Sequence, residues 1–191
     1  SVVAPHLCGM GGDLFALIHL NGEVHSLNAA GRAGSGVNPE ALRQSGLTSI
    51  PMIGNFNSVT VPGCVAGWLA LHERFGTLAL VDLFATAIDL AENGFAASPL
   101  LVGSLKRLDE SIKPNFAELT SQATEVGAIV KRPGLARTLR AIATSGHKAF
   151  YEGEFASGLI KMSNGVFSQD DLANAKATWD TPLSIDAYGY R

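Results

Sequence analysis

The stretch GMGGDLFALIHLNGEVHSLNAAGRAGSG, residues 9–36, decides the fold of this chain. Residues 14–20 (LFALIHL) form a continuous apolar run, and residues 23–27 (EVHSL) alternate in polarity. Asn21 and Gly22 stand between them. An Asn-Gly pair is the strongest short-range signal for a tight hairpin, because both residues tolerate the positive φ that the turn requires. We therefore predict an antiparallel hairpin whose first strand is buried on both faces.

Helical periodicity begins after Pro62. It predicts helices over residues 65–75 and 80–91, which the short turn at residues 76–77 should pair antiparallel. Shorter helices are predicted over residues 39–46 and 155–161. Apolar residues between positions 135 and 142 mark a further helix, which should end at Gly146. Ser168 and Asp171 have the spacing of a capping box, and residues 181–191 resemble a strand. A strand-rich start followed by a block of helices favours an α+β fold or a layered sandwich over a doubly wound sheet.

Length and composition limit the classes of function. The 191 residues suit one domain. The net charge is only -3, and the lysines and arginines are not gathered into the basic stripe that nucleic-acid binding requires, so no nucleic-acid partner is predicted. No run reaches the roughly 18 apolar residues of a membrane span. Two cysteines, Cys8 and Cys64, cannot build a disulfide framework. The start at Ser1 and the end inside a predicted strand lead us to expect that residues 1–191 are a single partial domain, truncated at both ends.

The glycine-rich opening does not fit a phosphate site. After Gly9 and Gly11, the third position of a dinucleotide fingerprint is Leu14, and no Gly-Lys-Ser/Thr follows. A strand follows the glycines, whereas a phosphate site needs the N-terminus of a helix. No nucleotide and no other cofactor is predicted. The glycines are interpreted as allowing close backbone packing at the start of the strand.

The histidines and serines give no complete catalytic or metal motif. His72 and Glu73 begin like the zinc-binding helix motif, but Gly76 stands where its second histidine would be, so no metal site is predicted. No G-x-S-x-G elbow occurs.

Arg32 stands alone among alanines and glycines. It is a candidate to bind a carboxylate through two hydrogen bonds, and a structural ion pair or a solvated loop residue are equal alternatives.

Five segments together resemble the large-subunit region of gamma-glutamyltransferases. In chain order they are residues 5–19 (PHLCGMGGDLFALIH), 28–34 (NAAGRAG), 61–98 (which begin VPGCVAGW and end LAENGFAAS), 135–160 (which contain AFYEGEF) and 167–191 (which contain DLA and end YGYR). The match runs in order over nearly the whole chain.

The resemblance implies a four-layer αββα N-terminal nucleophile hydrolase, made as one precursor that cuts itself into a large and a small subunit. In that family the new N-terminal threonine of the small subunit attacks a gamma-glutamyl amide, commonly glutathione, and its α-amino group acts as the base. The acyl group then passes to water or to an amino acid or peptide acceptor. The processing site falls after the region matched here, so no catalytic residue is expected among these 191.

One departure from the family pattern concerns the substrate. Classical members carry a carboxylate-binding arginine four residues before the proline of an Ala-Pro pair. Here the pair is Ala33-Gly34, which places Ala30 at the arginine position and Arg32 two residues later. Because residues two apart on a strand share a face, Arg32 is the candidate substrate-binding residue. The x-G-R-A arrangement is similar to that of transferase-like and acylase-like relatives.

The resemblance leaves three functions open: a gamma-glutamyltransferase-like enzyme, a cephalosporin-acylase-like hydrolase, and an inactive relative that binds a partner. The expected partners are a small-molecule gamma-glutamyl or acyl-amide substrate and the small subunit of the same precursor, in a homo- or hetero-oligomer or alone. The sequence does not decide between a cytoplasmic and a periplasmic or extracellular location.

We expect the 191 residues alone to be inactive and poorly soluble, because half of a sandwich leaves apolar sheet surface open.

Overall fold

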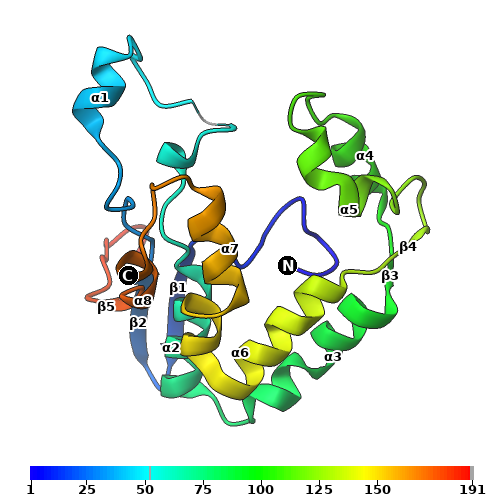
Figure 1. Cartoon of the computed structure of the whole chain (residues 1–191). Helices are drawn as coiled ribbons and strands as arrows, with labels where there is room; N and C mark the ends of the chain where they lie inside the picture. Colours follow the sequence, from blue (N-terminus) through cyan, green and yellow to red (C-terminus); the bar gives the residue numbers. More distant parts are fainter. Residues whose placement is uncertain (52, 190–191) are drawn as a thin grey trace.

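The computed structural model describes residues 1–51 and 53–189 and combines strands with helices (Figure 1). The strands are β1 (Leu14–Leu20), β2 (Glu23–Ala29), β3 (Phe95–Ala96), β4 (Ile129–Val130) and β5 (Thr178–Asp180). The helices are α1 (Pro39–Gln44), α2 (Cys64–Phe75), α3 (Leu80–Asn93), α4 (Pro99–Lys106), α5 (Ala117–Thr120), α6 (Pro133–Tyr151), α7 (Glu154–Met162) and α8 (Gln169–Ala173), with 3-10 turns η1 (Phe56–Ser58) and η2 (Lys113–Phe116). The predicted α+β class is confirmed.

The predicted hairpin is confirmed. β1 and β2 pair antiparallel from Leu14 opposite Ala29 to Leu20 opposite Glu23, and the turn residues Asn21 and Gly22 have φ of 53° and 84°. The expectation that β1 is buried on both faces is wrong, because Phe15 and Leu17 are 68% and 73% exposed. Helix α2 packs against the other face of the hairpin. In this chain, a continuous run of apolar residues therefore does not mean that the strand is buried on both faces.

The third strand of the sheet comes from the far end of the chain. β5 lies antiparallel to β2, with Ser26 opposite Asp180 and Asn28 opposite Thr178, and the sheet order is β1-β2-β5. The strand predicted over residues 181–191 is wrong as far as residue 186, since residues 181–186 have no strand structure, and residues 190–191 lie outside the described part. Trp179 explains the placement of β5: its ring meets Phe75 edge-on at 5.6 Å and so holds this short segment against α2.

The predicted helices are found, with two corrections. α3 packs along α6 instead of pairing with α2, and α2 and α3 meet through the rings of Trp68 and Phe84, whose centroids are 6.0 Å apart. α6 does not end at Gly146, where the backbone leaves helical geometry at φ 59° and ψ -136°. The helix resumes after this kink and ends at Tyr151. The capping box of Ser168 and Asp171 is confirmed at the start of α8.

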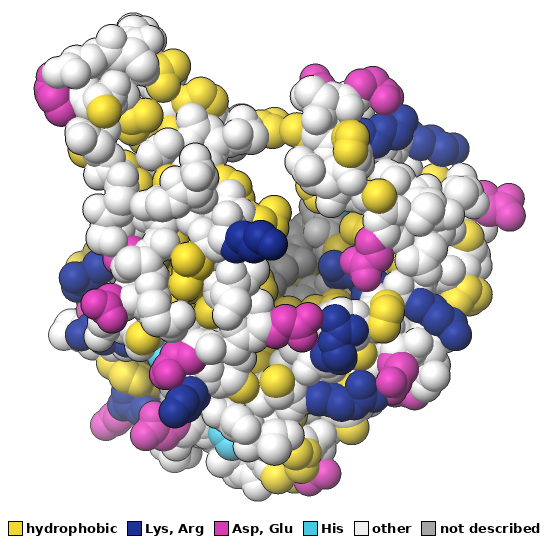
Figure 2. All heavy atoms as spheres, in the orientation of Figure 1, with side chains coloured by type: hydrophobic (Ala, Val, Ile, Leu, Met, Phe, Trp, Pro, Cys, Tyr) yellow, Lys and Arg dark blue, Asp and Glu magenta, His cyan; other side chains and the backbone are white. Residues whose placement is uncertain are grey.

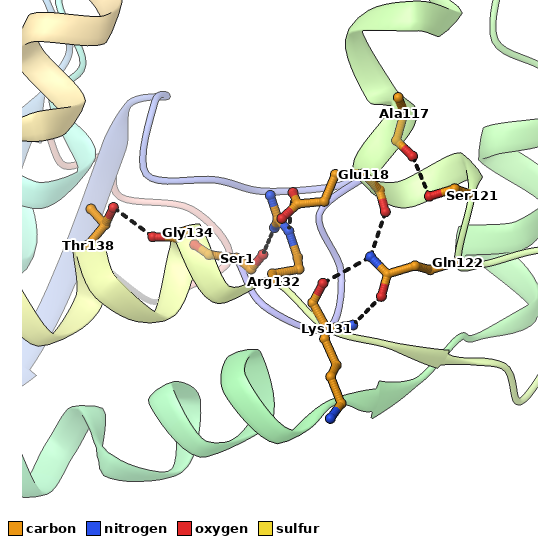
Figure 3. A network of polar contacts seen from close by, with 9 residues as sticks. All are labelled: Ser1, Ala117, Glu118, Ser121, Gln122, Lys131, Arg132, Gly134 and Thr138. Carbon is orange, nitrogen blue, oxygen red and sulfur yellow. Dashed lines mark hydrogen bonds and ion pairs between the residues drawn. The ribbon is translucent and has the colours of Figure 1, made fainter.

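The N-terminal segment is tied to the helical layer by a polar network around Arg132 and Gln122 (Figure 3). Arg132 donates from its guanidinium to the carbonyl of Ser1 at 3.3 Å and forms an ion pair with Glu118 at 3.4 Å. The Gln122 amide donates to the carbonyls of Glu118 and Lys131 and accepts from the Lys131 N–H at 2.8 Å. These contacts join α5, the start of α6 and the first residue of the chain.

Charged side chains of both signs are interspersed over the face drawn in Figure 2, and this face has no continuous basic stripe. Across the described residues, the helices are too short or too polar for one of them to cross a bilayer.

Candidate functional site

A cavity of about 630 Å³ lies at the end of β2. In Figure 1, α8 and β5 lie beside this strand. It is lined by Asn28, Ala30, Gly31, Arg32, Ala33, Val61, Gly63, Asp170, Asp171, Asn174, Ala175, Lys176 and Thr178. The walls thus come from three distant parts of the sequence: the segment after β2, the start of α2, and α8 with the residues leading into β5. Arg32 and Ala30, the two positions singled out from the sequence, both line it.

The backbone on the N-terminal side of Arg32 is held by Asp13. One oxygen of this carboxylate accepts from the Gly31 N–H at 3.1 Å and from the Thr60 hydroxyl at 3.3 Å. The Arg32 carbonyl accepts from the Val61 N–H at 2.8 Å. The two chain segments approach so closely that a Cβ on Gly31 would lie 1.6 Å from the Val61 carbonyl oxygen. Glycine is therefore required at position 31, and this close contact fixes the position of the Arg32 backbone.

The Arg32 side chain is exposed and has no ion-pair partner among the described residues. The alternative in which it forms a structural ion pair thus has no support in residues 1–51 and 53–189. Lys176 lines the same cavity, also without an ion pair in the described part of the chain. The cavity therefore offers two unpaired cations, of which the planar guanidinium suits a carboxylate through two parallel hydrogen bonds.

The backbone on the C-terminal side of Arg32 is held by Asp171. Its Oδ2 accepts from the N–H and hydroxyl of Ser35 at 3.0 and 2.7 Å, and from the N–H and hydroxyl of Ser168 at 2.8 and 2.9 Å. Partial burial acts to raise the pKa of this carboxyl, but the hydrogen bonds from Ser168 and Ser35 outweigh it and lower the pKa to about 2. Asp171 is therefore ionised at neutral pH.

The wall at the start of α2 is fixed by a buried tyrosine. The Tyr151 hydroxyl donates to the Pro62 carbonyl at 2.6 Å and accepts from the Ala66 N–H at 3.0 Å, and its burial raises its pKa to about 12. Burial also raises the pKa of the neighbouring Cys64 thiol to about 11. Since a thiol reacts as the thiolate, Cys64 is a poor nucleophile at neutral pH.

The glycine-rich loop of residues 9–12 does not have the role predicted from the sequence. Gly9 and Gly11 have open space where a Cβ would stand, so the expected close backbone packing there is wrong. The carbonyl of Gly12 accepts from the N–H groups of Gly63 and Cys64 at 3.0 and 2.8 Å. This loop therefore caps the first turn of α2.

His72, the histidine of the incomplete zinc motif, and His25 on β2 both have other contacts. His25 Nδ1 lies 3.0 Å from the Arg74 guanidinium, and His72 Nε2 lies 2.7 Å from the Leu78 carbonyl oxygen. No group of three potential ligands gathers within residues 1–51 and 53–189.

Sequence reasoning missed the second role of Asp171. Its helix-capping role is visible in the spacing from Ser168, but its partner Ser35 is 136 residues away and no local pattern connects them. The hydrogen bond from the Gly31 N–H to Asp13 likewise joins residues 18 positions apart, so no local pattern shows it. Lys176, Asn28 and Thr178 carried no signal in the sequence and enter the cavity because β5 pairs with β2.

Comparison with known proteins gives a consistent result over the whole chain. A family model described as gamma-glutamyltranspeptidase matches residues 1–191. The glutathione hydrolase-like YwrD proenzyme of Bacillus subtilis is 32% identical over 203 residues, which cover 100% of this chain and 38% of that protein. The oxamate amidohydrolase proenzyme of Klebsiella pneumoniae is 35% identical and is matched over 97% of this chain and 37% of its own length. The chain thus spans just over a third of these curated relatives.

Solved structures show the same fold. The gamma-glutamyltranspeptidase of Helicobacter pylori superposes with a TM-score of 0.87 at 30% identity, over 99% of this chain and 58% of that one. The cephalosporin acylase of Bacillus halodurans superposes with a TM-score of 0.88 at 32% identity, over 98% of this chain and 38% of that one. The gamma-glutamyltranspeptidase structures are N-terminal nucleophile hydrolases, so the fold expected from the resemblance is confirmed.

Proposed function

This chain belongs to the gamma-glutamyltranspeptidase family, and we propose that residues 1–191 are a partial domain from the large subunit of an amidohydrolase or acyltransferase. The substrate is an amide whose acyl group carries a carboxylate, gamma-glutamyl amides such as glutathione being the first candidates. The observation that carries the proposal is Arg32, an exposed guanidinium that lines the cavity at the end of β2 and has no ion-pair partner within residues 1–51 and 53–189. In this role Arg32 binds the donor carboxylate through two hydrogen bonds.

The chemistry is assigned to residues outside this chain. A threonine at the N-terminus of a small subunit from the same precursor attacks the amide carbonyl, and its α-amino group takes the hydroxyl proton. The amine leaves with that proton, and water or an amine acceptor then takes the acyl group from the threonine oxygen. The length of the relatives supports this division, since the chain covers just over a third of relatives named proenzymes.

A second candidate is an acylase that prefers a glutaryl amide. It is favoured by position 30, where alanine replaces the arginine expected for gamma-glutamyl donors, and by the likeness to the Bacillus halodurans cephalosporin acylase. A glutaryl group has the carboxylate but lacks the α-amino group. Comparing the kcat/KM of the processed full-length protein for a gamma-glutamyl anilide and a glutaryl anilide distinguishes the two. Absence of self-cleavage and of both activities would instead support the inactive relative that binds a partner.

The first testable prediction concerns Arg32. In the full-length protein, Arg32→Ala should lower kcat/KM for the preferred anionic donor about tenfold to a hundredfold, because hydrogen bonds to a charged group contribute roughly 1.5–3 kcal/mol. Steady-state kinetics measures this effect. Arg43→Ala is the matched control, since Arg43 is paired with Glu40 on α1 and does not line the cavity. An unchanged kcat/KM for Arg32→Ala would remove Arg32 from the binding site.

A further inference from the structure

The segment that carries Arg32 makes backbone contacts, on either side of Ser35, with the loop that precedes α8. The Gly36 N–H donates to the Val166 carbonyl at 3.1 Å. A Cβ on Gly34 would lie 2.2 Å from the Val166 carbonyl oxygen, and one on Gly36 would lie 1.8 Å from the Gly165 carbonyl oxygen. The strip of residues 34–36 therefore lies directly on the loop that precedes α8.

The side chains of Ser35, Ser168 and Asp171 complete this attachment. Ser35 donates twice to Asp171 Oδ2, and its hydroxyl also lies 3.3 Å from that of Ser168. Ser168 in turn accepts from the Asp171 N–H at 3.2 Å, which is the capping bond of α8. Asp171 Oδ2 thus takes part in the capping box of α8 and also accepts the hydrogen bonds from Ser35, which follows Arg32 in the chain. Hydrogen bonds to an ionised acceptor are the strong ones, and Asp171 is ionised at neutral pH.

We propose that Asp171 is a positioning residue, which holds the Arg32 segment through Ser35 and so sets where the guanidinium points in the cavity. The inference rests on the proposed function, because it assigns to Arg32 the binding of an anionic acyl group. Asp13 holds the backbone at Gly31 and Asp171 holds it at Ser35, so Arg32 lies on a short segment fixed by a carboxylate on each side. A residue on such a segment loses less conformational entropy when it binds its ligand.

The test measures donor kinetics of the full-length protein together with its binding of glutarate, a dicarboxylate probe, by calorimetry. Ser35→Ala removes the hydroxyl bond and leaves the capping box of Ser168 and Asp171 intact. We expect KM for the anionic donor and Kd for glutarate to rise about threefold to tenfold, with kcat within twofold of wild type, because one charge-assisted bond is lost outside the reacting atoms. Asp171→Asn should have the larger effect of the two variants.

Ser111→Ala is the matched control. The Ser111 hydroxyl donates to Asp109 at 2.6 Å, which is the same pair of residue types, and neither residue lines the cavity. This variant should leave KM, kcat and the glutarate Kd unchanged. In an Arg32→Ala background, Ser35→Ala should cause no further loss of glutarate affinity, because its effect acts through the guanidinium.

The outcomes separate this inference from the proposed function. If Arg32→Ala weakens glutarate binding while Ser35→Ala and Asp171→Asn behave like Ser111→Ala, the positioning role is overturned and the proposed binding role of Arg32 stands. If Ser35→Ala weakens binding equally with and without Arg32, the positioning role is also overturned. If glutarate binding depends on both residues but no amide is cleaved, the positioning role is supported and the proposed reaction fails.

Discussion

At the scale of single residues, the carboxylates around the cavity act on the backbone. Asp13 and Asp171 each accept hydrogen bonds from residues on different segments, and both neighbour the one cation that the sequence singled out. Arg32, in contrast, is left without a partner in the described part of the chain. The two carboxylates are thus satisfied within the fold, and among the described residues the Arg32 guanidinium and the Lys176 ammonium are the cavity cations left for a ligand.

The low pKa of Asp171 makes a prediction for stability against pH. The folded-state pKa of about 2 lies below the usual aspartate value of 3.8, so folding stabilises the ionised form. This contribution is present above pH 4 and is lost as the pH falls toward 2. Asp171→Asn should therefore be less stable than wild type from pH 5 to 7, and the difference should shrink between pH 4 and 2. Urea unfolding at several pH values measures it. A difference that stays constant down to pH 2 would contradict the assignment.

At the scale of elements, the kink in α6 links the helical layer to the cavity. Gly146 leaves helical geometry, and the residues after it carry Phe150 and Tyr151, both fully buried. Tyr151 then holds the Pro62 carbonyl and the first turn of α2. The glycine that the sequence marks as a helix end is therefore a change of direction within one helix.

This kink gives a matched pair of substitutions. Gly146→Ala should lower the free energy of unfolding by about 1–3 kcal/mol, because a side chain rarely adopts φ 59° with ψ -136° even though the space is open. Gly158→Ala, within α7 and equally open, should change stability little or raise it by about 0.5–1 kcal/mol. Chemical denaturation compares the two variants. Equal effects would show that the strain at Gly146 is not what requires glycine.

At the scale of the whole molecule, helices cover one face of the β1-β2-β5 sheet and leave apolar residues on the other. Phe15, Leu17 and Val24 are 68%, 73% and 49% exposed. In the four-layer sandwich that the resemblance implies for the whole protein, such a face would pack against a second sheet. Apolar surface of this kind promotes self-association when it is left open.

We therefore predict that the 191 residues expressed alone associate as concentration rises and cleave no gamma-glutamyl anilide. Leu17→Lys should reduce this association in the isolated chain and lower the soluble yield of the full-length precursor, where the face would be covered. Sedimentation velocity over a concentration series measures the first effect. Monodisperse behaviour with cooperative unfolding, or measurable turnover by the isolated chain, would contradict this prediction.

Local sequence patterns were enough to predict the first hairpin, the main helices and the family. The Asn21-Gly22 turn, the periodicity of α2 and α3 and the capping box of α8 depend on residues a few positions apart, so local patterns suffice to predict them. The sequence also singled out Arg32 from its lack of charged neighbours. The tertiary structure decided which residues share the cavity, since Ser35 meets Asp171 across 136 residues and β5 returns to β2 from the far end. It also left the outer face of β1 open and carried α6 past Gly146. Such outcomes depend on what packs against each segment, and a chain's local pattern does not record its distant neighbours.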